Sequence, residues 1–120
     1  MLEALELDCR REAQRIVAFI HQQLDAAGYS RLVLGLSGGV DSALVAALGV
    51  QAVGADNVHA MILPYATSNP ESEAHARLVV EALGIPCSQF EITDMVRPLL
   101  ARYPEMDARR MGNIMARCRM

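Results

Sequence analysis

One short glycine-rich segment carries the residue types that bind a polyanion. It lies between an apolar run and an Ala- and Leu-rich stretch, and it consists of Gly35, Leu36, Ser37, Gly38, Gly39, Val40, Asp41 and Ser42. Adjacent glycines let the backbone adopt positive φ and approach a phosphate without a Cβ in the way. Turn amides and the N-terminus of a following helix would then point at the anion, with serine hydroxyls as further donors. The segment therefore predicts a nucleotide phosphate site.

Asp41 is the acidic member of this segment. A carboxylate beside a pyrophosphate is repulsive unless a cation lies between them. Mg²⁺ suits this position, because it is commonly held by one or two carboxylates together with phosphate oxygens and waters. We therefore expect Asp41 to hold Mg²⁺ in the complex with the nucleotide. The plainer alternative is a structural glycine turn with Asp41 as a helix cap, but the run of such residues between a strand and a helix favours the phosphate site.

Composition excludes several other functions. All eleven basic residues are Arg, so a Walker loop with its Gly-Lys pair and Schiff-base chemistry on a lysine are both absent from this sequence. A net charge of −3 argues against nucleic acid as a partner. The three cysteines include no C-x-x-C pair, which favours free thiols in a reducing cytoplasm over a zinc site or disulfides. No apolar run approaches the ~20 residues needed to cross a membrane.

The hydrophobic pattern predicts the elements that position the segment. Apolar spacing indicates an amphipathic helix over 8–27, followed by Gly28 as its stop. The run 31–36 is nearly continuous and predicts a strand buried on both faces of a parallel sheet. Three strand–helix units follow from the alternation, over 31–53, 58–83 and 87–102, and a last helix begins at about 107. Ser68 or Asn69 is expected to cap the helix of the second unit.

This alternation predicts the fold class. We expect one domain over residues 1–120, an α/β Rossmann-like parallel sheet with helices on both faces, in three layers. Such sheets bind ligands at the carboxyl ends of their strands, where the glycine-rich segment stands.

Three segments together resemble a known family. Ser37 to Ser42 resembles the signature of the PP-loop ATP pyrophosphatases, which adenylate their substrates. Gly112 to Met120, GNIMARCRM, resembles the G-N-x-x-A-R-x-R-M element of ammonia-dependent NAD synthetases. Residues 63–70 are similar to the segment that follows the second strand of those enzymes. The chain thus resembles the N-terminal portion of an NAD synthetase.

The resemblance implies a ligase. In the family, deamido-NAD is adenylated by ATP and then amidated by ammonia, with release of pyrophosphate and AMP. By the same resemblance, residues 35–42 bind ATP, Asp41 binds Mg²⁺ and Arg117 contacts deamido-NAD. Arg119 lies two positions further on and points to a different side of the helix. A homodimer in the cytoplasm is also implied, and no side chain is expected to act as a covalent nucleophile.

Some features remain open at the level of sequence. The chain is about half the length of the family, whose sheet order 3-2-1-4-5 makes the loop-bearing strand central. Here that strand would be an apolar edge, so we expect the chain alone to be inactive and marginally folded.

Alternative functions are another PP-loop adenylating enzyme, of the GMP synthetase or RNA-modifying kind, or an inactive ATP-binding fragment. Met61 and Leu63 fit an adenine pocket or a core equally, and His59 fits a core histidine.

Overall fold

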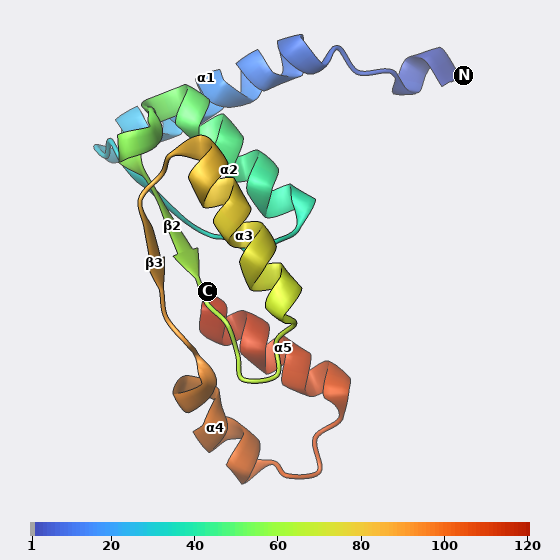
Figure 1. Cartoon of the computed structure of the whole chain (residues 1–120). Helices are drawn as coiled ribbons and strands as arrows, with labels where there is room; N and C mark the ends of the chain where they lie inside the picture. The colour runs from blue at the N-terminus through green and yellow to red at the C-terminus, as the bar shows by residue number, and fades with distance from the viewer. Residues whose placement is uncertain (1) are drawn as a thin grey trace.

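The computed structural model describes residues 2–120 (Figure 1). In chain order, its elements are η1 (Leu2–Leu5), α1 (Cys9–Ala27), β1 (Leu32–Gly35), α2 (Val40–Val53), η2 (Ala55–Asn57), β2 (Val58–Ile62), α3 (Pro70–Leu83), β3 (Cys87–Gln89), α4 (Thr93–Arg102) and α5 (Ala108–Arg119). The predicted helices and strands are therefore all present. None of the helices within residues 2–120 is long and apolar enough to cross a membrane.

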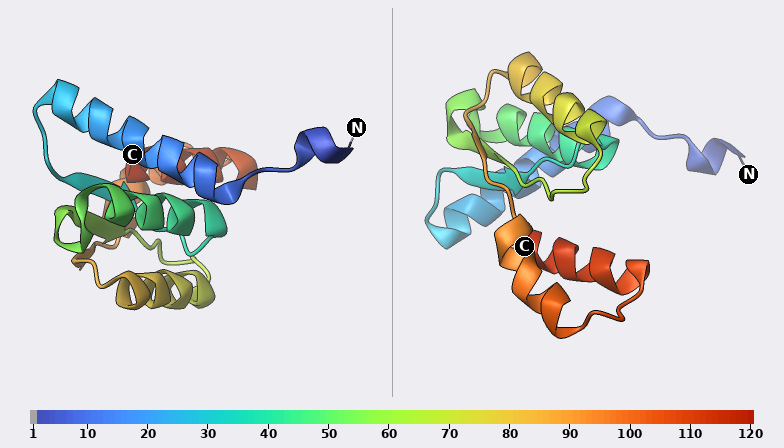
Figure 2. Two further views of the ribbon diagram at one scale, coloured as in Figure 1. Left: turned by 90° about the horizontal axis from the view of Figure 1, so that it is seen from above. Right: turned by 60° about the horizontal axis from the view of Figure 1, so that its bottom comes forward.

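The strands form one parallel sheet in the order β1-β2-β3. Leu32 of β1 pairs with Val58 of β2, and Ala60 pairs with Cys87 of β3. Because both crossovers step in the same direction and are right-handed, α2 and α3 lie on the same face of the sheet (Figure 2). Helix α1 packs beside α2, while α4 and α5 lie beyond the carboxyl ends of the strands (Figure 1). The predicted α/β class is confirmed, with β1 at the edge.

The core lies between the sheet and the helices α2 and α3. Every second residue of β2 faces it: Val58 and Ala60 are fully buried and Ile62 is 3% exposed. The remaining members of the cluster are Leu36, Ala46, Ala76 and Ile85. These residues are small or branched and carry no polar atoms, which suits the close packing of a helix layer on a sheet.

The opposite face of the sheet corrects one expectation. Val33 of β1 is 71% exposed, so this strand is not buried on both faces as its apolar sequence predicts. Within residues 2–120 the helix layer covers one face, and the described chain forms two layers of the expected three. His59 lies on this open face, half-buried, with its Nε2 atom 2.8 Å from Ser88 Oγ, and is therefore not a core histidine. An apolar run predicts burial but does not reveal which segment provides the cover.

The helix ends follow local side-chain chemistry. Asp8 caps α1 by accepting a hydrogen bond from the backbone of Arg11, and Gly28 ends the helix with φ of 76°. Asn69, and not Ser68, caps α3: its side chain accepts from the backbone N–H of Glu71. Strand β3 ends at Gln89 because it pairs only with Ala60–Ile62 of β2, so it is shorter than the predicted run to residue 92.

Candidate functional site

The glycine-rich turn joins the carboxyl end of β1 to the N-terminus of α2. Gly38 has φ of 85°, a left-handed conformation that favours glycine. It also lies directly against the first turn of α3: a Cβ at Gly38 would overlap the backbone carbonyl of Ser72 and lie 2.9 Å from its Cα. Both the dihedral angle and the contact therefore require glycine at this position.

Two serines hold this turn in shape. Ser42 Oγ accepts a hydrogen bond from the backbone N–H of Ser37 at 3.2 Å and donates to the carbonyl of Gly39 at 3.3 Å. The two hydroxyls are 3.1 Å apart, and Ser37 Oγ accepts from the backbone N–H of Gly39 at 3.2 Å. The first turn of α2 leaves its own N–H groups without partners inside the helix. The turn is thus a closed loop of hydrogen bonds at the positive end of a helix dipole, which suits an anion.

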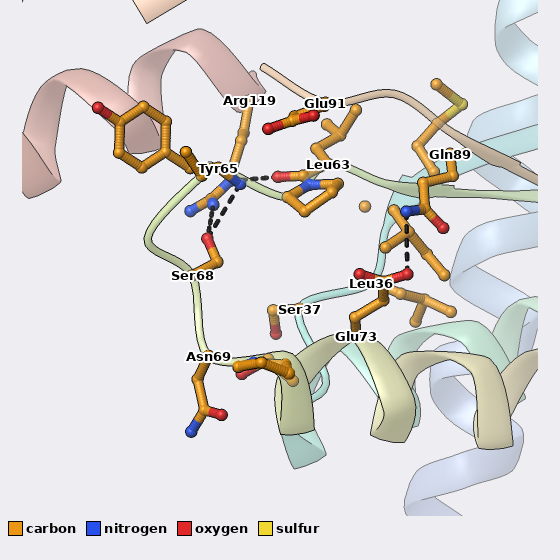
Figure 3. Close-up of a pocket in the computed structure, with 17 residues that line it drawn as sticks. Leu36, Ser37, Leu63, Tyr65, Ser68, Asn69, Glu73, Gln89, Glu91 and Arg119 are labelled. Atoms are coloured by element: carbon orange, nitrogen blue, oxygen red, sulfur yellow. Dashed lines mark hydrogen bonds between the residues drawn. The ribbon is translucent and has the colours of Figure 1, made fainter. Parts of the chain in front are cut away.

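A cavity of about 620 Å³ opens beside this turn, at the carboxyl ends of the strands. Its size is typical of a site for a small organic ligand. Figure 3 shows Ser37 and Leu36 on one side, with Glu73 and Gln89, and the segment 63–69 with Arg119 on the other. Gln89 donates a hydrogen bond to Glu73 Oε1 at 2.9 Å, which joins the end of β3 to α3. The cavity therefore combines apolar walls with a few fixed polar groups.

The segment 63–69 follows β2 and forms much of one wall of the cavity. Its carbonyl at Pro64 accepts from the backbone N–H of Ile92 at 2.9 Å, and the N–H of Ala66 donates to Thr93 Oγ1 at 3.0 Å. Arg119 of α5 makes a further contact, through Nε to the carbonyl of Leu63 at 2.8 Å. The wall is therefore attached to the beginning of α4 and to the end of α5.

The structure brings together only part of the residues that the sequence singles out for ATP. Gly35, Leu36 and Ser37 line the cavity. Val40, Asp41 and Ser42 stand in the first turn of α2, next to the cavity but not among its lining residues. Met61 and Leu63 also line the cavity, so neither is a pure core residue, and contact with adenine stays a prediction for both.

Asp41 is the residue that the sequence singles out as a ligand for Mg²⁺. Its side chain is exposed in the first turn of α2, beside the amides of the turn. Within residues 2–120, no group of three or more His, Cys, Asp or Glu side chains could hold a metal ion by itself. One carboxylate completed by phosphate oxygens and waters is a usual arrangement for Mg²⁺. The donor set therefore suits Mg²⁺ bound together with a polyphosphate rather than a preformed protein cage.

The two arginines near the end of α5 lie differently. Both are exposed, but Arg119 lines the cavity and Arg117 does not. Since the residues are two apart, their side chains leave the helix in different directions, as the sequence predicts. Which of them faces the cavity depends on the rotation of α5 about its axis, which follows from tertiary packing. A role for Arg117 in binding deamido-NAD stays a prediction.

Comparison with known proteins identifies the relatives of this site. The sequence model of the NAD synthase family matches residues 12–120, which is nearly the whole chain. The chain belongs to the NAD synthase family. The turn, the cavity and the α5 segment all lie within the matched residues.

Individual members of the NAD synthase family agree with this assignment. An NH(3)-dependent NAD(+) synthetase of Trichlorobacter lovleyi is 46% identical over 119 residues, which is 99% of this chain. The structure of the NH3-dependent NAD synthetase of Campylobacter jejuni, in complex with nitrate, matches with a TM-score of 0.88 at 30% identity over 96% of the chain. A glutamine-dependent NAD+ synthetase of Acinetobacter baumannii, in complex with ADP, matches over 89% with a TM-score of 0.82 at 31% identity.

The chain spans about half the length of the two ammonia-dependent relatives and a smaller share of the glutamine-dependent one. It covers 44% of the Trichlorobacter lovleyi protein, 50% of the Campylobacter jejuni chain and 21% of the Acinetobacter baumannii chain. The match thus concerns one part of each relative, and in this chain that part contains the glycine-rich turn and its cavity.

Proposed function

We propose that this chain binds Mg·ATP as part of an ammonia-dependent NAD synthetase, a ligase that converts deamido-NAD to NAD. One observation carries the proposal: the beginning of the glycine-rich segment, Gly35 to Ser37, lines the cavity of about 620 Å³ at the carboxyl ends of the strands, and the Gly38 turn follows directly in the chain. ATP needs two neighbouring environments of this kind, a turn with hydrogen-bond donors for its polyphosphate and a partly apolar cavity for its adenosine. Membership of the NAD synthase family supports the choice of reaction.

The triphosphate is proposed to lie along residues 35–42. The N-terminus of α2 would donate hydrogen bonds to phosphate oxygens through its backbone amides, while the N–H groups of Ser37 and Gly39 bond to the serine hydroxyls and hold the turn in shape. The adenosine would then occupy the cavity, between Leu36 on one side and the segment 63–69 on the other. Fixed dipoles of this kind stabilise negative charge on the departing pyrophosphate better than water does, because they are oriented before the reaction begins.

Asp41 is proposed to hold the Mg²⁺ that accompanies ATP. When bound, the ion neutralises charge on the phosphates. The carboxylate of Asp41 stands in the first turn of α2, so it can reach a ligand that the turn amides hold. Without Mg²⁺ this carboxylate would repel the phosphates. When Mg²⁺ is bound, the carboxylate would instead be one of its ligands.

The acceptor is proposed to be deamido-NAD. Its nicotinate carboxylate would attack the α-phosphorus of ATP, forming an NAD-adenylate and releasing pyrophosphate. Ammonia would then attack the activated carbonyl carbon, so that AMP leaves and the amide of NAD forms. Arg117 is proposed to bind the acceptor, because a guanidinium matches a carboxylate or a phosphate with two parallel hydrogen bonds. The protein's task is to hold both substrates close together and in line.

The chain is proposed to supply only part of this enzyme. Its matches are to about half of each ammonia-dependent relative. We therefore expect ATP binding by this chain without NAD formation. A homodimer in the cytoplasm is the proposed setting of the complete enzyme. Other PP-loop acceptors, such as those of GMP synthetases or RNA-modifying enzymes, are disfavoured by the family match.

Two assays on the same protein test this function. The first is calorimetric titration with the non-hydrolysable analogue α,β-methylene-ATP and Mg²⁺, for which we expect one site per chain. The second follows AMP and NAD formation from deamido-NAD, ATP, Mg²⁺ and ammonia, for which we expect no turnover. Failure to bind the analogue would overturn the proposed role in ATP binding, and robust NAD formation would overturn the proposed incompleteness.

A further inference from the structure

Arg119 makes two hydrogen bonds across the cavity wall. Its Nε donates to the carbonyl of Leu63 at 2.8 Å, and its Nη2 donates to Ser68 Oγ at 3.3 Å (Figure 3). These partners stand near the two ends of the segment 63–69. Figure 3 shows the guanidinium next to Tyr65, between the two acceptors. A planar guanidinium with several fixed donors can hold two acceptors at once, which an ammonium on a flexible chain does poorly.

The turn that Arg119 contacts has its own internal hydrogen bonds. The N–H of Ser68 donates to the carbonyl of Tyr65 at 2.9 Å, and the N–H of Tyr65 donates to Ser68 Oγ at 3.0 Å. Ser68 Oγ therefore serves both as the acceptor that closes the turn and as the contact for Arg119. Since Asn69 caps α3, the hydroxyl of Ser68 is not needed at the helix N-terminus. Its interactions stabilise the cavity wall.

The other attachments of the segment lie at a different place. Pro64 is tied to Ile92 and Ala66 is tied to Thr93, both at the beginning of α4. Arg119 reaches Leu63 and Ser68 from α5. Removal of Arg119 would therefore release Leu63 and Ser68, the latter closing the turn through Tyr65, while leaving the α4 attachments of Pro64 and Ala66 in place.

We propose that Arg119 is a positioning residue for the nucleotide. By joining Leu63 to Ser68 it sets the shape of the cavity wall against which adenosine would pack. This inference rests on the proposed binding of ATP. It links the end of α5, where Arg117 is proposed to meet the acceptor, to the ATP cavity through two specific hydrogen bonds.

Affinity for Mg·α,β-methylene-ATP provides the first test. We expect Arg119→Ala to weaken binding ~10-fold, because charge-assisted hydrogen bonds that shape the site are lost. Arg119→Lys should weaken it nearly as much, since one ammonium cannot hold both acceptors. The matched control is Arg109→Ala, which removes the same charge from the exposed first turn of α5 and should bind as the wild type does. Binding by Arg119→Lys at the wild-type level would contradict the proposal and favour a simple charge effect.

Amide hydrogen exchange without nucleotide provides the second test. In Arg119→Ala we expect faster exchange at Tyr65 and Ser68, and unchanged exchange at Ile92, whose N–H bonds Pro64. Arg109→Ala should match the wild type at all three amides. Unchanged exchange at Tyr65 and Ser68 would overturn the positioning role. If the wild type binds no ATP analogue, the proposed function fails, while the exchange result still decides whether Arg119 positions the wall.

Discussion

Gly38 and Ser72 are in backbone contact, with no room between them for a side chain. The contact joins the turn after β1 to the first turn of α3, so two helix N-termini meet at one side of the cavity. Such an approach is possible only because Gly38 lacks a Cβ and adopts φ of 85°. The geometry of the turn is therefore fixed by its neighbour as well as by its own sequence.

Replacing Gly38 tests that relationship. Gly38→Ala should lower the free energy of unfolding by about 1–3 kcal/mol, because the backbone is strained and the Cβ displaces Ser72. It should also weaken binding of Mg·α,β-methylene-ATP at least ~10-fold. Chemical denaturation and calorimetric titration measure the two effects. Gly112→Ala is the matched control, since a Cβ there meets nothing within 4 Å. Equal stability of the two variants would contradict the account.

The role of Asp41 is tested by comparing binding with and without Mg²⁺. Asp41→Asn should weaken binding of the ATP analogue ~10-fold in Mg²⁺, because a metal ligand is lost. In EDTA the same variant should bind at least as tightly as the wild type, since a repulsive charge has been removed. Asp56→Asn, in η2 after the C-terminal end of α2, serves as the charge-matched control. An equal loss in both conditions would argue against a metal ligand at this position.

Ser42 organises the turn through its hydroxyl. Ser42→Ala removes the acceptor for the backbone N–H of Ser37 and the donor to Gly39. We expect a loss of about 1 kcal/mol in the free energy of unfolding, together with weaker nucleotide binding. Ser30→Ala, in the exposed connection before β1, should change neither quantity. Denaturation curves and titrations of both variants check this, and wild-type behaviour of Ser42→Ala would show that the hydrogen bonds contribute nothing.

The open face of the sheet can be probed by making the same isosteric substitution, Val to Thr, on each face of the sheet. Val33→Thr should change the free energy of unfolding by less than ~0.5 kcal/mol, since Val33 is 71% exposed. Val58→Thr should cost about 1–3 kcal/mol, because it places a hydroxyl in the fully buried core. Denaturation of both variants gives the comparison. A similar cost at both positions would indicate that another surface covers this face in solution.

Local chemistry explains which parts of the fold are predictable from sequence. The ends of α1 follow from residues beside them, since Gly28 adopts the left-handed conformation that the stop requires. The glycine-rich turn is equally local, because its residue types dictate its backbone and its place between strand and helix. These features depend on a few residues that are neighbours in the chain, so they can be predicted from one sequence.

Features that depend on distant segments could not be predicted in the same way. The apolar sequence of β1 does not show that Val33 lies on an uncovered face. The spacing of Arg117 and Arg119 shows that they diverge, but only the docking of α5 places Arg119 at Leu63. The backbone contact between Gly38 and Ser72 likewise joins segments that are far apart in sequence. Each of these relationships is set by tertiary packing.

Mapping of the bound nucleotide by NMR tests the central claim most directly. The chain, labelled with ¹⁵N, would be titrated with Mg·α,β-methylene-ATP while the backbone amide resonances are followed. Binding at the proposed site should shift the amides of residues 37–42 and of the segment 63–69. The amides of His21 in α1 and Asn57 in η2, which do not line the cavity, should keep their positions. Absence of any shift, or shifts confined to residues outside the turn and its cavity, would contradict the account.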